Sequence, residues 1–147
     1  MWLGHIYYTL GLIPLLMTLA IIIKLKDYNR VKEWYSKFEK VTGGKPKQED
    51  FRSTEEYSMY TGVSGVLVVD FIWVILGLLT QSWYIFLFIL SLTIILNITK
   101  KAMSLDIISR LTTAIVIITK FSVYLYLIIN HFHLHYNTWE VVKNLIQ

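Results

Sequence analysis

The sequence contains no cysteine. This absence excludes disulfide bonds, thiol catalysis, cysteine-ligated zinc and iron–sulfur clusters from the chemistry of the chain. Charge is also scarce, because Asp, Glu, Lys and Arg make up 16% of the 147 residues, whereas about a quarter is usual in a soluble domain. Hydrophobic residues make up 55%. The composition is therefore typical of a membrane protein, and the length is that of one domain.

Four apolar segments follow one another along the chain. A helix rises about 1.5 Å per residue, so a hydrocarbon core of about 30 Å needs about 20 residues. Lipid offers no hydrogen-bond partner to the backbone, so every N–H and C=O group must be paired within the protein, which favours helices. We expect an all-α integral membrane protein with four transmembrane helices in one bundle, plus a cytoplasmic amphipathic helix after the first span. The single membrane domain (1–147) has expected spans at about 5–24, 58–79, 82–99 and 106–130, a cytoplasmic loop at 25–57 and an outer C-terminal segment at 131–147.

The lysines and arginines predict the orientation. Nine of the fourteen lie between the first two spans and three between the third and fourth, while the opposite side has only Lys143. Basic loops stay cytoplasmic, so both termini are expected on the non-cytoplasmic side. No Lys or Arg precedes the first span, which is unlike a signal peptide, and we expect this segment to be retained. The pattern favours the bacterial inner membrane, with the mitochondrial inner membrane as the alternative, and it explains the positive charge without nucleic acid.

Local signals predict where helices bend, end and begin. Pro14 predicts a kink in the first span. Aromatic and aliphatic residues recur at helical spacing over residues 27–40, which predicts the amphipathic helix. Gly43 and Gly44 should end it. Ser53, with a glutamate three residues later, has the spacing of a capping box and should begin the second span.

Two ionisable residues lie deep in the expected spans. Asp70 in the second span and Lys120 in the fourth lie about 16–20 Å along their helices. An isolated charge at that depth costs at least about 2.5–3.5 kcal/mol, so we expect the two side chains to form an ion pair. Such a pair either fixes which helices touch or carries protons or ions. In a third interpretation the two do not meet, and Asp70 is protonated or bonded to a partner subunit.

Two further sets of residues lie on single helix faces. Polar side chains share a face of the fourth span with Lys120, and these are Asp106, Ser109, Thr113, Tyr124 and His131. Such a stripe faces the bundle interior, where polar side chains bond between helices. Alternatively, it lines a hydrated path or faces a quinone-like head group. Small residues in the second span would allow another helix to pack closely, and these are Ser58, Thr61, Gly62 and Gly65.

The topology places all four histidines on the outer side. Neutral imidazole binds zinc, copper or haem iron. On a helix, His131 and His135 would lie one turn apart on one face and could form a metal site with His5, while His133 would point elsewhere. The alternative is that these histidines are solvated interfacial residues. No histidine lies at the bilayer centre, so bis-histidine haem is not expected there.

The sequence carries no familiar catalytic constellation. The first span lacks the acidic residue on which small multidrug exporters depend, and residues 61–65 do not form a potassium-channel filter. Our first hypothesis is an accessory or structural subunit of a larger membrane complex for energy transduction, secretion or transport, rather than an enzyme. Its partners would be the lipid bilayer and other membrane subunits or further copies of the chain. The alternatives are a homo-oligomeric ion- or proton-coupled transporter using Asp70 and Lys120, and a metal- or haem-binding redox component using the outer histidines.

Overall fold

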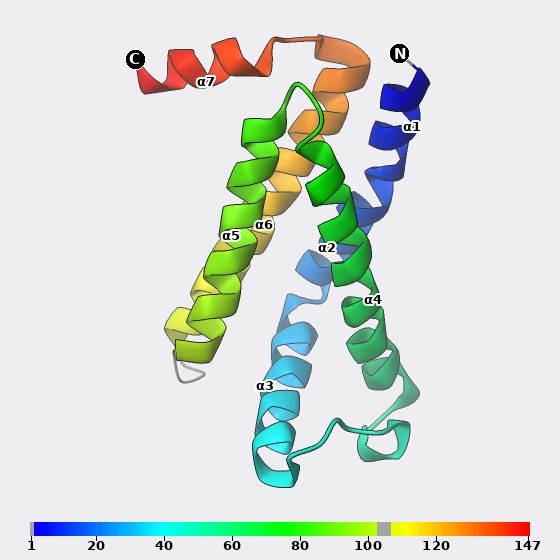
Figure 1. Cartoon of the computed structure of the whole chain (residues 1–147). Helices are drawn as coiled ribbons and strands as arrows, with labels where there is room; N and C mark the ends of the chain where they lie inside the picture. Colours follow the sequence, from blue (N-terminus) through cyan, green and yellow to red (C-terminus); the bar gives the residue numbers. More distant parts are fainter. Residues whose placement is uncertain (1, 103–106) are drawn as a thin grey trace.

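The computed structural model describes residues 2–102 and 107–147, and leaves aside the side chains of 62–67, 96–97, 99–102 and 108–109. Within these ranges the chain is helical and has no strand (Figure 1). The α-helices are α1 (Trp2–Leu10), α2 (Leu12–Ile23), α3 (Leu25–Thr42), α4 (Thr54–Gly77), α5 (Trp83–Ala102), α6 (Ile107–Ile129) and α7 (Thr138–Ile146). A 3-10 turn, η1 (Gln48–Asp50), precedes α4, and a π-helical turn, η2 (Asn130–Leu134), continues α6.

Two helical stretches in the described ranges are long and apolar enough to cross a membrane. They are Trp2–Ile23, which comprises α1 and α2, and Arg110–Leu134, which comprises most of α6 with η2. The second stretch runs past residue 130, where we expected the last span to end. It therefore includes part of the segment that we expected to lie outside.

The first three helices follow one another with short interruptions. α1 and α2 are separated only at Gly11, although the Leu15 amide still donates to the Gly11 carbonyl at 3.2 Å. Pro14 lies in the first turn of α2 and has no N–H to donate to the preceding turn, which explains an interruption at this point. A second interruption at Lys24 begins α3, whose buried residue is Val31.

Caps end α3 and begin α4 as the sequence predicts. Gly43 follows the last residue of α3 with a φ of 68°, in the left-handed region, and its amide donates to the Glu39 carbonyl. After the turn η1, Ser53 caps α4, because its hydroxyl accepts from the Glu56 amide at 3.2 Å.

The hydrophobic core lies where α1, α2, α4, α5 and α6 meet, in the half of the bundle that also holds both termini (Figure 1). Its buried residues are Tyr8, Leu15, Trp73, Val74, Phe86, Ile89, Tyr124, Leu127 and Ile128. Two glycines allow close packing there. A Cβ added to Gly11 would lie 2.4 Å from the Trp73 ring, and one added to Gly77 would lie 2.3 Å from the Phe86 ring.

At the other end, α3 and the first turns of α4 project together beyond the α5–α6 hairpin (Figure 1). Ion pairs join these helices: Lys24 Nζ to Glu55 Oε1 at 2.6 Å, and Arg30 Nη2 to Glu56 Oε1 at 2.7 Å. Glu33 of α3 reaches α6, where Arg110 Nε donates to its Oε1 at 2.6 Å. Ion pairs therefore join the helices at this end of the protein, whereas the buried hydrophobic core lies at the other.

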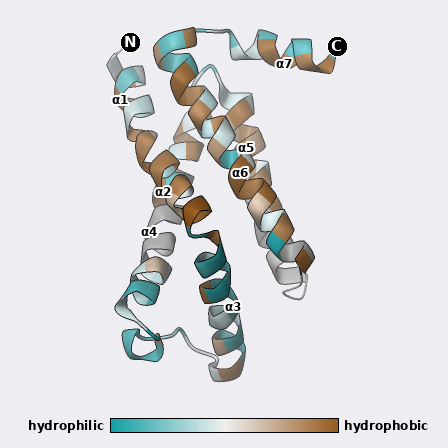
Figure 2. Ribbon diagram, turned by 180° about the vertical axis from the view of Figure 1, so that it is seen from behind, coloured by the Kyte–Doolittle hydropathy of each residue, from teal (hydrophilic) through white to brown (hydrophobic). Residues whose placement is uncertain are grey.

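The outer surfaces of α2, α5, α6 and the second half of α4 are largely apolar. Leu16 on α2, Phe71 on α4, Phe88 on α5 and Ile118 on α6 are each about half exposed or more. Figure 2 shows hydrophobic residues along α2, α5 and α6 and hydrophilic ones on α3. α7 lies at the same end of the bundle as the N-terminus and extends away from α1 (Figure 1). The protein thus presents apolar side chains where a water-soluble bundle would present polar ones.

Candidate functional site

The site is built on an ion pair between α4 and α6. Lys120 Nζ lies 2.7 Å from Asp70 Oδ2, and the two side chains are 10% and 9% exposed. Helical spacing turns both residues toward the interior. The structure therefore brings together the two residues that the sequence analysis identified by their expected depth in the second and fourth spans.

Tyr124 completes the contact one turn beyond Lys120 on α6. Its hydroxyl donates to Asp70 Oδ1, so each carboxylate oxygen has its own donor. The Lys120 ammonium also lies 5.7 Å from the centre of the Tyr124 ring. The opposite charges of Asp70 and Lys120 therefore compensate each other, and the neutral Tyr124 hydroxyl stabilises the carboxylate by a hydrogen bond.

Aromatic rings pack against this cluster. The Trp73 ring, one turn after Asp70 on α4, meets the Tyr124 ring edge to face with centroids 5.2 Å apart. The Phe86 ring of α5 packs against the other edge of Trp73 at 5.1 Å. Low polarity strengthens the attraction between Asp70 and Lys120, but it also makes each charge costly if its partner is removed. The arrangement can hold α4 against α6, and it can store or pass a proton only if the ion pair opens.

The rest of the expected polar stripe is only partly described. Thr113 is buried on α6, as are Lys120 and Tyr124, while His131 is half-buried beyond them. Asp106 and the side chain of Ser109 lie outside the described residues.

The structure pairs two of the outer histidines. His131 Nε2 lies 3.0 Å from His5 Nδ1, and the Tyr8 ring stacks on His131 with centroids 4.2 Å apart. The π-helical turn ends at His135, which has a φ of 52°, and the His135 amide donates to the Asn130 carbonyl at 2.8 Å. A metal site formed by His5, His131 and His135 stays a prediction.

No group of three or more His, Asp or Glu side chains in the described ranges is arranged to hold a metal ion. Two imidazoles hydrogen-bonded to each other do not complete the three or four protein ligands that zinc sites use. The pair fits a contact between α1 and the end of α6 better than a metal centre.

The small-residue face of α4 is turned away from the rest of the chain where it is described. Ser58 and Thr61 are exposed, and the Thr61 hydroxyl donates to the carbonyls of Tyr57 and Ser58 in its own helix. The positions of Gly62 and Gly65 lie outside the described side chains.

Sequence reasoning missed the most specific contacts of this region. The predicted polar stripe includes Tyr124 but does not predict its hydrogen bond to Asp70. A hydroxyl donor one helical turn from Lys120 is the signal in the sequence that could have indicated this bond. The hydrogen bonds between Tyr7 and Trp73 left no signal in the sequence, because the two residues are 66 positions apart.

No known protein family, curated protein or solved structure matches this chain.

Proposed function

We propose that this is a four-span integral membrane protein that acts as an accessory or structural subunit of a larger membrane complex. The observation that carries the proposal is the closed cluster of Asp70, Lys120 and Tyr124 inside helices whose outer faces are apolar. Charged side chains in the interior and apolar side chains on the outer faces are the distribution expected of a helix bundle in lipid. Because both oxygens of Asp70 have donors, the cluster fits a role in holding helices together.

Helix lengths support four spans. α4 has 24 residues and α5 has 20, which correspond to about 36 and 30 Å at about 1.5 Å per residue. Both lengths match a hydrocarbon core of about 30 Å. With α1–α2 and α6–η2, they make four crossings.

Charge distribution supports an orientation with both termini outside. The termini lie at the same end of the bundle (Figure 1), and the basic helix α3 and the following loop lie at the other. Basic segments stay on the cytoplasmic side. This arrangement is compatible with the bacterial inner membrane and with the mitochondrial inner membrane.

Exposed faces support a role in assembly. Ser58 and Thr61 of α4 are exposed, and small residues of this kind let another helix pack closely in lipid. The projecting α3–α4 hairpin gives a second surface for a partner in the cytoplasm.

Topology can be tested directly because the chain has no cysteine. We expect Lys45→Cys to react with an impermeant maleimide only after the membrane is opened, and Gln147→Cys to react in intact cells. Labelling of both in intact cells, or neither, contradicts the proposed orientation. Release of the wild-type protein from membranes by alkaline carbonate contradicts membrane insertion.

The subunit role is tested by purification from native membranes in a mild detergent. We expect partners to co-elute at fixed stoichiometry. Elution of the chain alone, as a monomer or homo-oligomer, contradicts the role of subunit.

The second candidate is a homo-oligomeric ion- or proton-coupled transporter. It is favoured by one observation, the line of buried polar residues Thr113, Lys120 and Tyr124 on α6. This candidate requires that Asp70→Asn abolish ion movement in proteoliposomes while assembly stays normal. If assembly fails in the same proportion, the structural role is favoured.

A further inference from the structure

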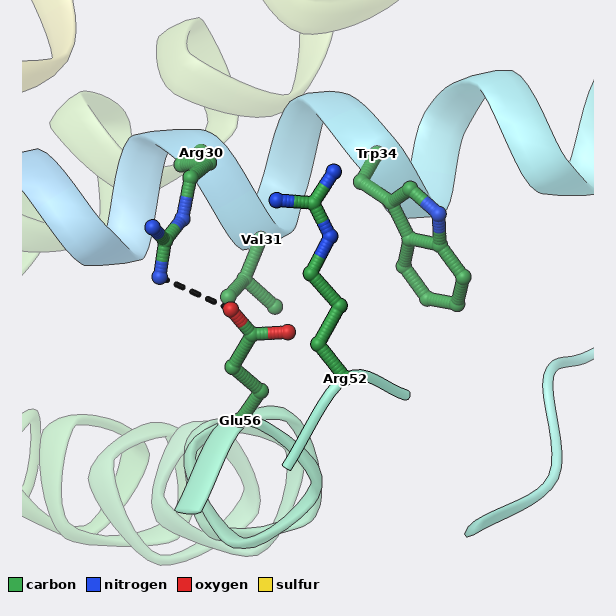
Figure 3. Close-up of a pocket in the computed structure, with 5 residues that line it drawn as sticks. All are labelled: Arg30, Val31, Trp34, Arg52 and Glu56. Atoms are coloured by element: carbon green, nitrogen blue, oxygen red, sulfur yellow. Dashed lines mark hydrogen bonds and ion pairs between the residues drawn. The ribbon is translucent and has the colours of Figure 1, made fainter. Parts of the chain in front are cut away.

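A cleft lies where α3 packs against the beginning of α4, at the end of the molecule opposite the termini. Its volume is about 70 Å³. A single water needs roughly 10–15 Å³ on the same measure, so the cleft has room for the few oxygen atoms of a phosphate group. The residues that line it are Arg30, Val31, Trp34, Arg52 and Glu56 (Figure 3).

The two arginines of the cleft have different surroundings. Arg30 forms ion pairs with Glu56 at 2.7 Å and Asp27 at 3.5 Å, and both start from Nη2. Arg52 forms no ion pair with any residue that the structure describes. Its guanidinium reaches from the loop toward α3 and ends between Arg30 and Trp34 (Figure 3). The cleft therefore holds one guanidinium that is ion-paired and one that forms no ion pair among the described residues, with the Glu56 carboxylate lining the cleft beside them.

Donors remain for a ligand on both arginines. A guanidinium has five N–H groups in a planar fork that matches the oxygens of phosphate. Arg30 uses Nη2 for its carboxylate partners, which leaves its other N–H groups free to donate. An anion between the two guanidiniums would also relieve the repulsion between their positive charges.

Trp34, which lines the cleft, begins a row of packed aromatic rings. The Trp34 ring lies 4.8 Å from the Phe51 ring, and the Phe51 ring lies 5.3 Å from the Tyr60 ring. Trp and Tyr are enriched where a membrane meets water. The combination of arginines and interfacial aromatics is typical of a site at the level of lipid head groups.

The depth of the cleft agrees with that level, given the membrane placement proposed above. Glu56 lies four residues before Tyr60 on α4, which is about 6 Å along the helix. The head-group layer extends roughly 5–8 Å beyond the hydrocarbon core on each side. A lipid phosphate at the cytoplasmic surface could therefore reach Arg52.

We propose that this cleft binds a phosphate group, with Arg52 as the main donor and Arg30 as the second. The phosphate belongs either to the head group of an anionic phospholipid or to a free phosphate ion. Charge-assisted bonds from a guanidinium fork to phosphate oxygens supply the affinity.

The test measures ligand retention by the purified full chain in a neutral detergent, with native mass spectrometry. The probes are phosphatidic acid, phosphatidylcholine and inorganic phosphate. The variant is Arg52→Gln, and the matched control is Lys45→Gln, which removes one positive charge from the same exposed loop without touching the cleft. Arg52→Lys keeps the charge but loses the planar fork.

We expect Arg52→Gln to weaken binding about tenfold or more, as the loss of a charged hydrogen bond predicts. Lys45→Gln should bind as the wild type does, and Arg52→Lys should fall between them. Retention of phosphatidic acid but neither phosphatidylcholine nor inorganic phosphate identifies a lipid head group. Arg52-dependent retention of inorganic phosphate, equal to that of the lipid, identifies a free phosphate.

Equal losses in Arg52→Gln and Lys45→Gln would overturn the proposal, because they would show attraction to the net charge of the loop. So would the absence of retention of any anionic probe by the wild type. Circular dichroism and gel filtration confirm that the variants fold. Since this measurement is made in detergent, its failure is distinguishable from a failure of the proposed membrane role.

Discussion

Tyr7 and Trp73 exchange hydrogen bonds across the contact between α1 and α4. The Tyr7 hydroxyl donates to the Trp73 carbonyl at 2.5 Å, and the Trp73 indole Nε1 donates to the Tyr7 carbonyl at 3.0 Å. Their rings also stack with centroids 5.2 Å apart. The exchange ties the first helix to the helix that carries Asp70.

Removing one half of this exchange should destabilise the protein measurably. We expect Tyr7→Phe to lower the free energy of unfolding by roughly 0.5–1.5 kcal/mol, the usual net value of one hydrogen bond. Thermal unfolding in detergent checks it. Tyr136→Phe, at a tyrosine that is 60% exposed, is the matched control and should unfold as the wild type does. Equal stability of the two variants would show that the exchange contributes nothing.

Gly11 should not tolerate a side chain. A Cβ at this position would lie 2.4 Å from the Trp73 ring, so Gly11→Ala forces the ring or α1 to move. We expect a loss of roughly 1–3 kcal/mol, as for other overpacked cores. Gly44→Ala is the control, because nothing lies within 4 Å of its added Cβ. A Gly11→Ala protein with an unchanged unfolding midpoint would mean that α1 does not pack against Trp73.

The ion pair between Lys24 and Glu55 should titrate in acid. The hydrogen bond and the charge of Lys24 lower the pKa of the Glu55 carboxyl. A carboxyl whose pKa is lower when folded stabilises the fold above its ordinary pKa of about 4.3, and this contribution is lost as the pH falls through the folded value. The α3–α4 contact should therefore be complete at neutral pH and weaken in acid.

Carboxyl NMR of Glu55 measures this effect. Lys24→Gln should return the pKa of Glu55 toward its ordinary value, whereas Lys26→Gln, at an exposed lysine two residues away, should leave it lowered. A Glu55 pKa that does not respond to Lys24→Gln would argue against the ion pair.

The sequence was sufficient to predict features that depend on local rules. Gly43 and Ser53 mark helix ends through backbone conformation and capping, and these act within one turn. The meeting of Asp70 and Lys120 follows from their similar depth, because an unpaired charge in lipid is costly.

Features that depend on how helices rotate and settle against each other could not be predicted. The Tyr124 hydroxyl reaches Asp70 only because α6 is turned by a particular angle, and Arg110 reaches Glu33 across 77 residues of sequence. The π-helical turn at Asn130–Leu134 could not be predicted either, because no residue there signals an i→i+5 hydrogen bond.

We infer that Asp70 and Lys120 hold the bundle together, and a double-mutant cycle tests this inference. The abundance of the protein in membranes and the yield of co-purifying partners are measured for Asp70→Leu, for Lys120→Met and for the double variant that carries both changes. Each single change should lose about 3–5 kcal/mol of stability, because it leaves a buried charge or donor without its partner, while the apolar double variant should regain most of it. We expect the double variant to accumulate and to bind partners as the wild type does. Asp70→Leu protein that accumulates and assembles at wild-type levels would contradict the inference that the ion pair holds the bundle together.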